Sequence, residues 1–265
     1  MNRLRKTGHI LLWAGMAASI VLCISFSNKQ QNNLTCSEIK IKINEEDGHY
    51  FIEEVDIRNL LTDKGKDVRG LKLNAINIGL LEKILKNNPF VANAEVFSTI
   101  DGKVSISINQ RRPLVRIINN ADEQYYIDSE GKYMPLSEKY TARVVVANGH
   151  ILNRFGEKEI MTDENCEHCF PSQKISGEIF KVASFIDNDP FWKAFVEQIY
   201  VTVDQELELI PKVGDYKILI GDSRNLELKL KTLLVFYKKA LSRIGWDKYS
   251  VINLKYKDQV VCTRN

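Results

Sequence analysis

Hydrophobic and polar residues alternate strictly at two places in the first half of the chain. The segment 38–44 reads EIKIKIN, and the segment 104–109 reads VSISIN. Alternation with a period of two is typical of a strand with one buried face. Asp101-Gly102 precedes the second segment, and Asp-Gly is the preferred centre of a tight hairpin turn. We therefore predict a strand over 38–44 and a hairpin over 95–110.

Between these strands the apolar spacing is helical. Apolar residues recur at intervals of three and four in 51–61 and again in 77–86. Asn77 can cap the second helix, and Pro89 prevents its continuation. The resulting order, β-α-α-β-β, predicts a small domain over 38–112 with its own core.

Residues 113–265 predict a larger, β-rich domain of mixed α+β class. Short strand patterns occur at 114–118, 125–128, 132–136, 143–147, 199–203, 206–210, 217–220, 249–256 and 259–263. Apolar stripes of helical spacing cover 172–187 and 226–244, and Gly245 can end the second helix. We interpret these stripes as core, because a stripe on one helix face usually packs inward.

The N-terminal apolar pattern is different, because residues 7–28 contain no charged side chain. Twenty-two helical residues span roughly 33 Å, which is enough for the ~30 Å hydrocarbon core of a bilayer. Three cationic residues precede the segment, so the N-terminus is expected in the cytoplasm and the rest outside. We predict a cytoplasmic tail at 1–9, a transmembrane helix at 10–27 and a linker at 28–37. The alternative is a cleaved signal peptide, but the apolar run is long and lacks a clear cleavage site.

Composition and charge exclude some function classes. The chain has 37 Lys and Arg against 34 Asp and Glu, a net charge of +3. Arg3, Arg5 and Lys6 account for that excess, so the remainder is electrically balanced and binding to nucleic acid is not expected.

Candidate chemistry is sparse. Cys166, His168 and Cys169 supply at most three zinc ligands, so we interpret 166–169 as a loop with a local disulfide or free thiols, with metal or redox chemistry as the alternative. Acidic residues such as Asp187 and Asp189 are interpreted as solvated surface or helix caps. No phosphate loop, nucleophile elbow or zinc-protease motif occurs, so we expect no enzyme, no cofactor, no metal and no small-molecule substrate.

Four segments resemble the FtsQ/DivIB family of bacterial cell-division proteins. NPFVANAEV at 88–96 resembles the step from the second helix into the hairpin of the family's POTRA module. VSISINQRRP at 104–113 resembles its strand ending in Glu-Arg-x-Pro, with Gln110 in place of the acid. YIDSEG at 126–131 is similar to its Val-Asp-x-x-Gly turn, and 252–261 resembles its terminal strands. The QRRP ending looks most like the Bacteroidetes branch.

The resemblance implies a fold and a function. The domain at 38–112 would be POTRA-like, and 113–265 would be the C-terminal β-domain. The chain would be a single-pass protein of the cell inner membrane, mostly periplasmic, at the division septum. It would be a scaffold without catalytic activity that links FtsB-like and FtsL-like proteins to other divisome components.

The resemblance also implies a binding edge, because the family's β-domain binds FtsB by accepting a partner strand at its last strand. A terminal strand leaves one row of N–H and C=O groups open to such a peptide. The residues that this role would assign are Tyr256, Gln259, Val260, Val261, Cys262 and Thr263. The alternative is an ordinary hairpin whose edge the domain covers. The strand at 39–43 is a second candidate surface for septal proteins.

A different function class stays open on the sequence alone. A periplasmic enzyme tethered to the membrane could act on cell-wall material, and it would need a pocket with converging polar groups.

Overall fold

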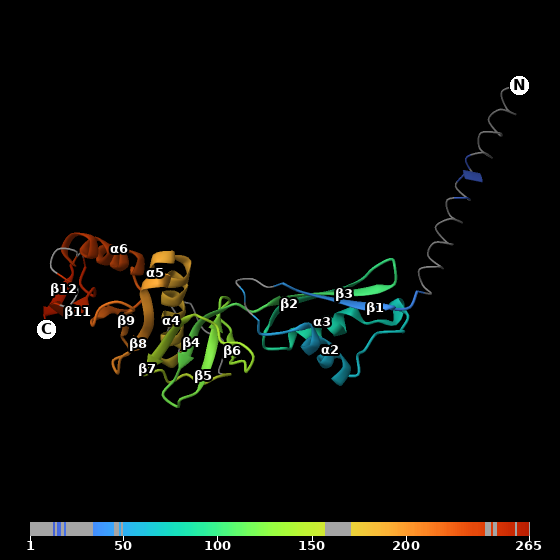
Figure 1. The fold of residues 1–265 in the computed structure, drawn as a ribbon, viewed down its shortest axis with the longest axis horizontal. Coiled ribbons are helices and arrows are strands. Elements are labelled where there is room, and N and C mark those ends of the chain that lie inside the picture. Colours follow the sequence, from blue (N-terminus) through green and yellow to red (C-terminus); the bar gives the residue numbers. More distant parts are fainter. Residues whose placement is uncertain are drawn as a thin grey trace, which may run out of the picture. The chain divides into compact units, whose positions relative to one another are not determined.

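The computed structural model describes residues 34–44, 50–156, 171–241, 248–257 and 259–264, together with six single positions (13, 15, 16, 19, 48 and 245). The chain divides into two compact units, 1–110 and 111–265 (Figure 1). No helix among these described residues combines the length and the hydrophobicity of a membrane span. The predicted transmembrane helix at 10–27 lies outside them except at four positions, and Cys166 and Cys169 also lie outside them.

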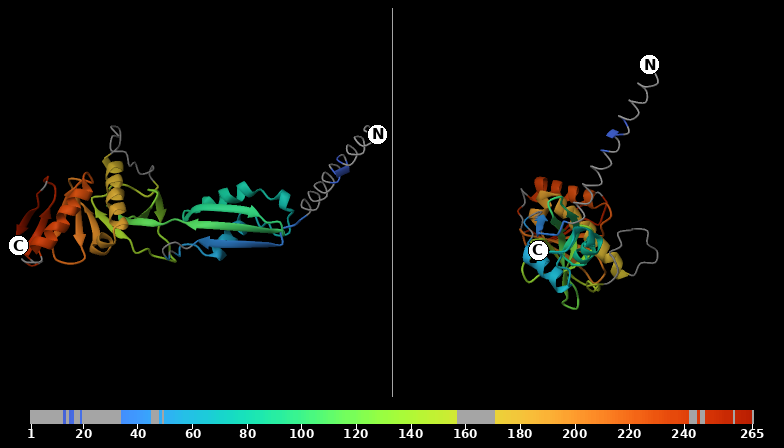
Figure 2. Two further views of the ribbon diagram at one scale, coloured as in Figure 1. Left: turned by 90° about the horizontal axis from the view of Figure 1, so that it is seen from above. Right: turned by 90° about the vertical axis from the view of Figure 1, so that its right-hand side faces the viewer.

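Unit 1 has the order β-α-α-β-β that the sequence predicts. Its elements are β1 (Glu38–Asn44), α2 (Glu54–Asp63), the short 3₁₀-helix η1 (Leu73–Ala75), α3 (Ile78–Lys86), β2 (Val91–Ser98) and β3 (Lys103–Gln110). The sheet order is β1-β3-β2, with β1 parallel and β2 antiparallel to β3 (Figure 2).

Local signals explain these elements. The alternating apolar residues of β3, Val104, Ile106 and Ile108, are all buried. The Asn77 side chain accepts a hydrogen bond from the Leu80 N–H at 3.0 Å, so it caps α3 as predicted.

The β2–β3 loop differs from the predicted Asp-Gly turn. Its loop residues are 100–102, because the Thr99 N–H donates to the Lys103 carbonyl at 2.8 Å. Of Asp101 and Gly102, only the glycine has a positive φ, +81°. A two-residue type I′ turn requires a positive φ at both central positions, whereas a three-residue loop needs it only at the last.

Over its described residues, unit 2 contains one nine-stranded sheet with three α-helices. The strands are β4 (Pro113–Ile118), β5 (Gln124–Asp128), β6 (Tyr133–Pro135), β7 (Val145–Gly149), β8 (Val196–Val201), β9 (Leu207–Pro211), β10 (Lys217–Gly221), β11 (Tyr249–Asn253) and β12 (Val261–Arg264). The helices are α4 (Pro171–Asn188), α5 (Pro190–Phe195) and α6 (Leu226–Phe236), and α6 continues as the π-helix η2 (Tyr237–Leu241). The strand order is β12-β11-β10-β9-β8-β7-β4-β5-β6.

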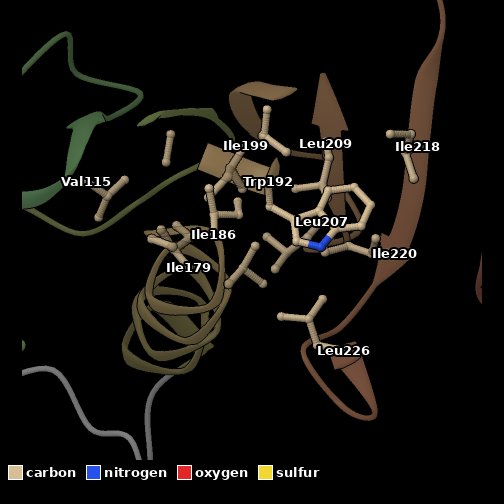
Figure 3. Packing of buried hydrophobic residues seen from close by; sticks show 14 of the residues in the cluster. Val115, Ile179, Ile186, Trp192, Ile199, Leu207, Leu209, Ile218, Ile220 and Leu226 are labelled. Carbon is tan, nitrogen blue, oxygen red and sulfur yellow. The ribbon is translucent and has the colours of Figure 1, made fainter. Parts of the chain in front are cut away.

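The core of unit 2 lies between the helices and one face of this sheet. The predicted stripe of α4, which includes Ile179 and Ile186, is buried in it together with Trp192 of α5 (Figure 3). Ile199, Leu209 and Ile218 are cross-strand partners on β8, β9 and β10, and all three are fully buried. Residues paired across a sheet share a face. Ile199, Leu209 and Ile218 therefore mark the face of the sheet that the helices cover.

The two C-terminal strands are shorter than predicted. The Asn253 side chain accepts a hydrogen bond from the Lys255 N–H at 2.9 Å. Such a turn diverts the backbone and ends β11 at Asn253. The strand β12 begins only at Val261, so Tyr256, Gln259 and Val260 lie in the connection between the strands.

Candidate binding edge at the last strand

The strand β12 is one of the two edges of the nine-stranded sheet. It pairs antiparallel with β11, and β11 pairs parallel with β10. No strand among the described residues pairs with the other side of β12. One row of backbone N–H and C=O groups therefore faces away from the sheet and can pair with an added strand.

The side chains of β12 divide between the two faces of the sheet. Cys262 pairs with the fully buried Ile252 and packs against the core. Its burial raises the pKa of its thiol. Val261 is 44% exposed and Thr263 is exposed, and alternation places both on the opposite face. The core-side face of the edge is therefore apolar at Cys262.

The segment that directly precedes β12 in the chain lines a pocket of about 300 Å³. Leu228 and Thr232 of α6 form one wall, and Leu254, Tyr256 and Gln259 from the β11–β12 connection form another. Leu254 is buried, whereas Leu228 and Tyr256 are exposed. Two of the six residues predicted for partner binding, Tyr256 and Gln259, thus line a pocket, while Val261, Cys262 and Thr263 lie on the edge strand.

Two of the three lysines that line this pocket, Lys229 and Lys255, form ion pairs within the unit. Lys255 Nζ lies 2.6 Å from Glu206 Oε1, and this hydrogen bond raises the pKa of Lys255. Lys229 Nζ lies 3.0 Å from Asp222 Oδ1 and donates to the Ile220 carbonyl at 2.8 Å. Burial alone would raise the pKa of Asp222, but hydrogen bonds from Arg224 and Lys229 outweigh burial and lower it. These pairs hold α6 and the connection against β9 and β10.

The opposite edge of the same sheet is protected. It is formed by β6, which has three residues and ends in Pro135. Proline has no N–H to donate, so it blocks pairing with an added strand. The strand β12 contains no proline.

At each edge of the three-stranded sheet in unit 1, a helix side chain forms a hydrogen bond with one backbone group of the edge strand. Glu82 Oε1 accepts from the Val96 N–H of β2 at 3.0 Å, and Arg58 donates to the Ile39 carbonyl of β1 at 3.2 Å. At β12, the Ser250 hydroxyl donates to the Thr263 carbonyl at 3.5 Å, and Ser250 belongs to β11, the strand with which β12 already pairs. Each edge of the unit 1 sheet therefore has one backbone group that a helix side chain already bonds, whereas the side-chain bond at β12 comes from its own partner strand.

The family-like motifs serve the fold rather than this edge. Gln110 Oε1 accepts from the N–H groups of Phe51 and Ile52 at 2.9 and 3.1 Å, so a neutral amide fills the position of the usual acid. Asp128, in the turn motif, is 2% exposed and pairs with Arg111 at 2.7 Å. Sequence reasoning missed this role, because the two residues are separated along the chain.

Asp187 corrects one interpretation from the sequence. It is neither solvated surface nor a helix cap, because it pairs with Arg112 at 2.6 Å and with Lys193 at 2.7 Å. Asp189, in contrast, caps α5 by accepting from the Phe191 and Trp192 N–H groups, as predicted. Among the described residues, no group of His, Cys, Asp and Glu side chains could hold a metal ion.

Fold and edge together define a class: a POTRA-like α+β domain followed by a β-rich domain whose last strand is paired on one side only among the described residues. Comparison with family models agrees with this description. Residues 34–109 match a POTRA-like domain, and residues 112–263 match the family described as FtsQ/DivIB, C-terminal related. The second match covers more than half of the chain, which therefore belongs to the FtsQ/DivIB family. A comparison with curated proteins gave no match.

Family membership gives the broad function. Proteins of this family are generally non-enzymatic division proteins, so the chain is assigned to cell division and to membrane association at the division site.

Proposed function

We propose that this chain is a non-catalytic scaffold of the divisome that accepts a strand from an FtsB-like partner at β12, with FtsL-like and other septal proteins in the same assembly. The observation that carries the proposal is the contrast between the two edges of the nine-stranded sheet. The edge at β6 ends in Pro135, whereas β12 presents an unpaired side without proline among the described residues.

The predicted membrane anchor completes this proposal. The uncharged segment at 10–27 would hold the chain in the inner membrane, with the N-terminus in the cytoplasm and both units in the periplasm. That arrangement would bring β12 to the compartment where an extended periplasmic segment of the partner can reach it.

The test is binding of the purified full chain to the periplasmic part of the FtsB-like protein from the same organism. A chain that ends at Tyr256 lacks β12, so we expect its binding to be lost. Val261→Asp places a charge on the exposed face of β12 and is expected to weaken binding several-fold. Val203→Asp is the matched control, because Val203 is also exposed and apolar but lies between β8 and β9.

Circular dichroism and thermal unfolding would establish that each variant remains folded. Binding that survives removal of β12 in a folded chain would refute strand addition there. Failure of the intact chain to bind any division protein would contradict the scaffold proposal itself.

A further inference from the structure

The chain enters unit 1 between two of its loops. The Cys36 N–H donates to the Leu71 carbonyl at 2.8 Å, and the Ser37 N–H donates to the Gly102 carbonyl at 2.8 Å. Leu34 is also fixed, because its carbonyl accepts from the Leu73 N–H at 3.0 Å. Residues 34–37 are thus attached to the 71–73 segment and to the tip of the β2–β3 hairpin.

These two loops expose apolar side chains at the same end of the unit. Ile100, in the hairpin loop, is 84% exposed, and Leu71 is 48% exposed. Figures 1 and 2 show the hairpin at the end of unit 1 where β1 begins. Hairpin loops favour Gly, Asn, Asp and Ser, so an exposed isoleucine there is not explained by turn chemistry.

Several charges at this end are paired, whereas Lys72, next to Leu71, is exposed and forms no ion pair among the described residues. Lys103 Nζ lies 2.9 Å from Glu38 and 3.9 Å from Asp101, and Arg69 pairs with Asp67 at 2.6 Å. Protruding apolar side chains with one exposed lysine beside them are suited to the interface of a bilayer, where the apolar groups enter the acyl boundary and the cation meets the headgroups.

Chain length limits how far this end can lie from the membrane. The predicted helix ends at residue 27, and the chain is fixed again at Leu34. Seven residue steps reach at most roughly 25 Å when fully extended. The strand β3 leads away from the hairpin loop to Gln110, where unit 1 ends, so the chain leaves at the opposite end of the sheet.

We infer that the loop end of unit 1 contacts the lipid surface of the membrane, with Ile100 inserted at the interface and Leu71 in the other loop at the same end of the unit. This inference rests on the proposed membrane anchor. The contact would orient unit 1 with its loop end toward the bilayer, in addition to the restraint from the linker that joins it to the predicted anchor.

The test uses the full chain reconstituted in phospholipid vesicles. The photo-reactive residue p-benzoylphenylalanine replaces Ile100 in one sample, Val203 in a second and Val21, in the predicted anchor, in a third. Val203 is the matched control because it is apolar and 72% exposed but belongs to unit 2. After irradiation, mass spectrometry measures the fraction of chain that gains the mass of one phospholipid.

We expect lipid adducts at positions 21 and 100, with the yield at 100 several-fold above that at 203. Adducts at 21 with only the control level at 100 would overturn the lipid contact and leave the anchor intact. A cross-linked dimer at 100 in place of the lipid adduct would overturn it in favour of a second copy of the chain. The absence of adducts at 21 would overturn the anchor and this inference together.

Discussion

At the scale of single residues, the polar side chains that look most characteristic are structural. Asp128 Oδ1 accepts from the N–H groups of Glu130 and Lys132 at 2.9 and 2.8 Å, and its Oδ2 accepts from Arg111. One buried carboxylate thus closes the turn after β5 and fixes the residue that follows β3. A buried, paired charge is costly to leave without its partner.

Asp128→Ala is therefore expected to destabilise the protein by about 3–5 kcal/mol, because it leaves Arg111 and two turn N–H groups without their acceptor. Asp128→Asn keeps Oδ1 as an acceptor and should cost less. Glu130→Ala is the control in the same turn: its ion pair with Lys132 is exposed, so its loss should cost less than about 1 kcal/mol. Urea unfolding measures all three, and equal effects of Asp128→Ala and Glu130→Ala would refute this role.

At the scale of elements, the close approach of β7 and β8 depends on one glycine. Gly149, at the end of β7, pairs with Val201 and has a φ of +97°. A Cβ at this position would overlap the backbone O and N atoms of Val201. Backbone atoms of a central strand cannot move aside without breaking the ladder, so the sheet itself requires glycine here.

Gly149→Ala is expected to destabilise unit 2 by roughly 2–4 kcal/mol, from the strained φ and the overlap together. Gly156→Ala separates the two causes, because Gly156 has a similar φ of +83° with nothing within 4 Å of a Cβ. It should cost only about 1–2 kcal/mol. Thermal and urea unfolding compare the variants. A Gly149→Ala protein no less stable than Gly156→Ala would show that β7 and β8 can move apart to accommodate the added Cβ.

At the scale of the whole molecule, stability depends on carboxylates that stay ionised in the fold. Burial alone would raise the pKa of Asp187, but hydrogen bonds from Lys193 and Arg112 outweigh burial and lower it below the ordinary value of 3.8. Asp222 shows the same balance with Arg224 and Lys229. A carboxyl whose pKa is lowered by folding adds stability above its unfolded pKa and loses it as the pH falls through its folded pKa.

The free energy of unfolding is therefore expected to change little from pH 7 to 5 on account of these groups and to fall below about pH 4. Asp187→Asn should lower stability at pH 7 by about 1.5–3 kcal/mol, the range for hydrogen bonds to charged groups. It should also make the acid loss shallower, since one of the titrating groups is gone. Urea unfolding at pH 7, 5, 4 and 3 tests this, and an identical pH profile for variant and parent would contradict it.

Much of the secondary structure is determined by the sequence alone, because its signals are local. The period-two pattern of 38–44 predicts β1 with the observed bounds, and Asn77 predicts the start of α3. A strand's alternation or a helix cap involves residues within a few positions of each other, so no distant partner is needed to recognise it. The family motifs at 104–113 and 126–131 are readable in the same way, although their physical roles are not.

Only the tertiary structure decided which strands lie at an edge and which charges meet. Nothing near β12 in the sequence shows that it ends a nine-stranded sheet, because strand order depends on packing between distant segments. Likewise, Asp187 finds Arg112, 75 residues away, only because α4 packs near the start of β4. The placement of Ile100 and Leu71 at one end of unit 1 also depends on the fold, since backbone bonds from residues 36 and 37 attach both loops to the entering chain.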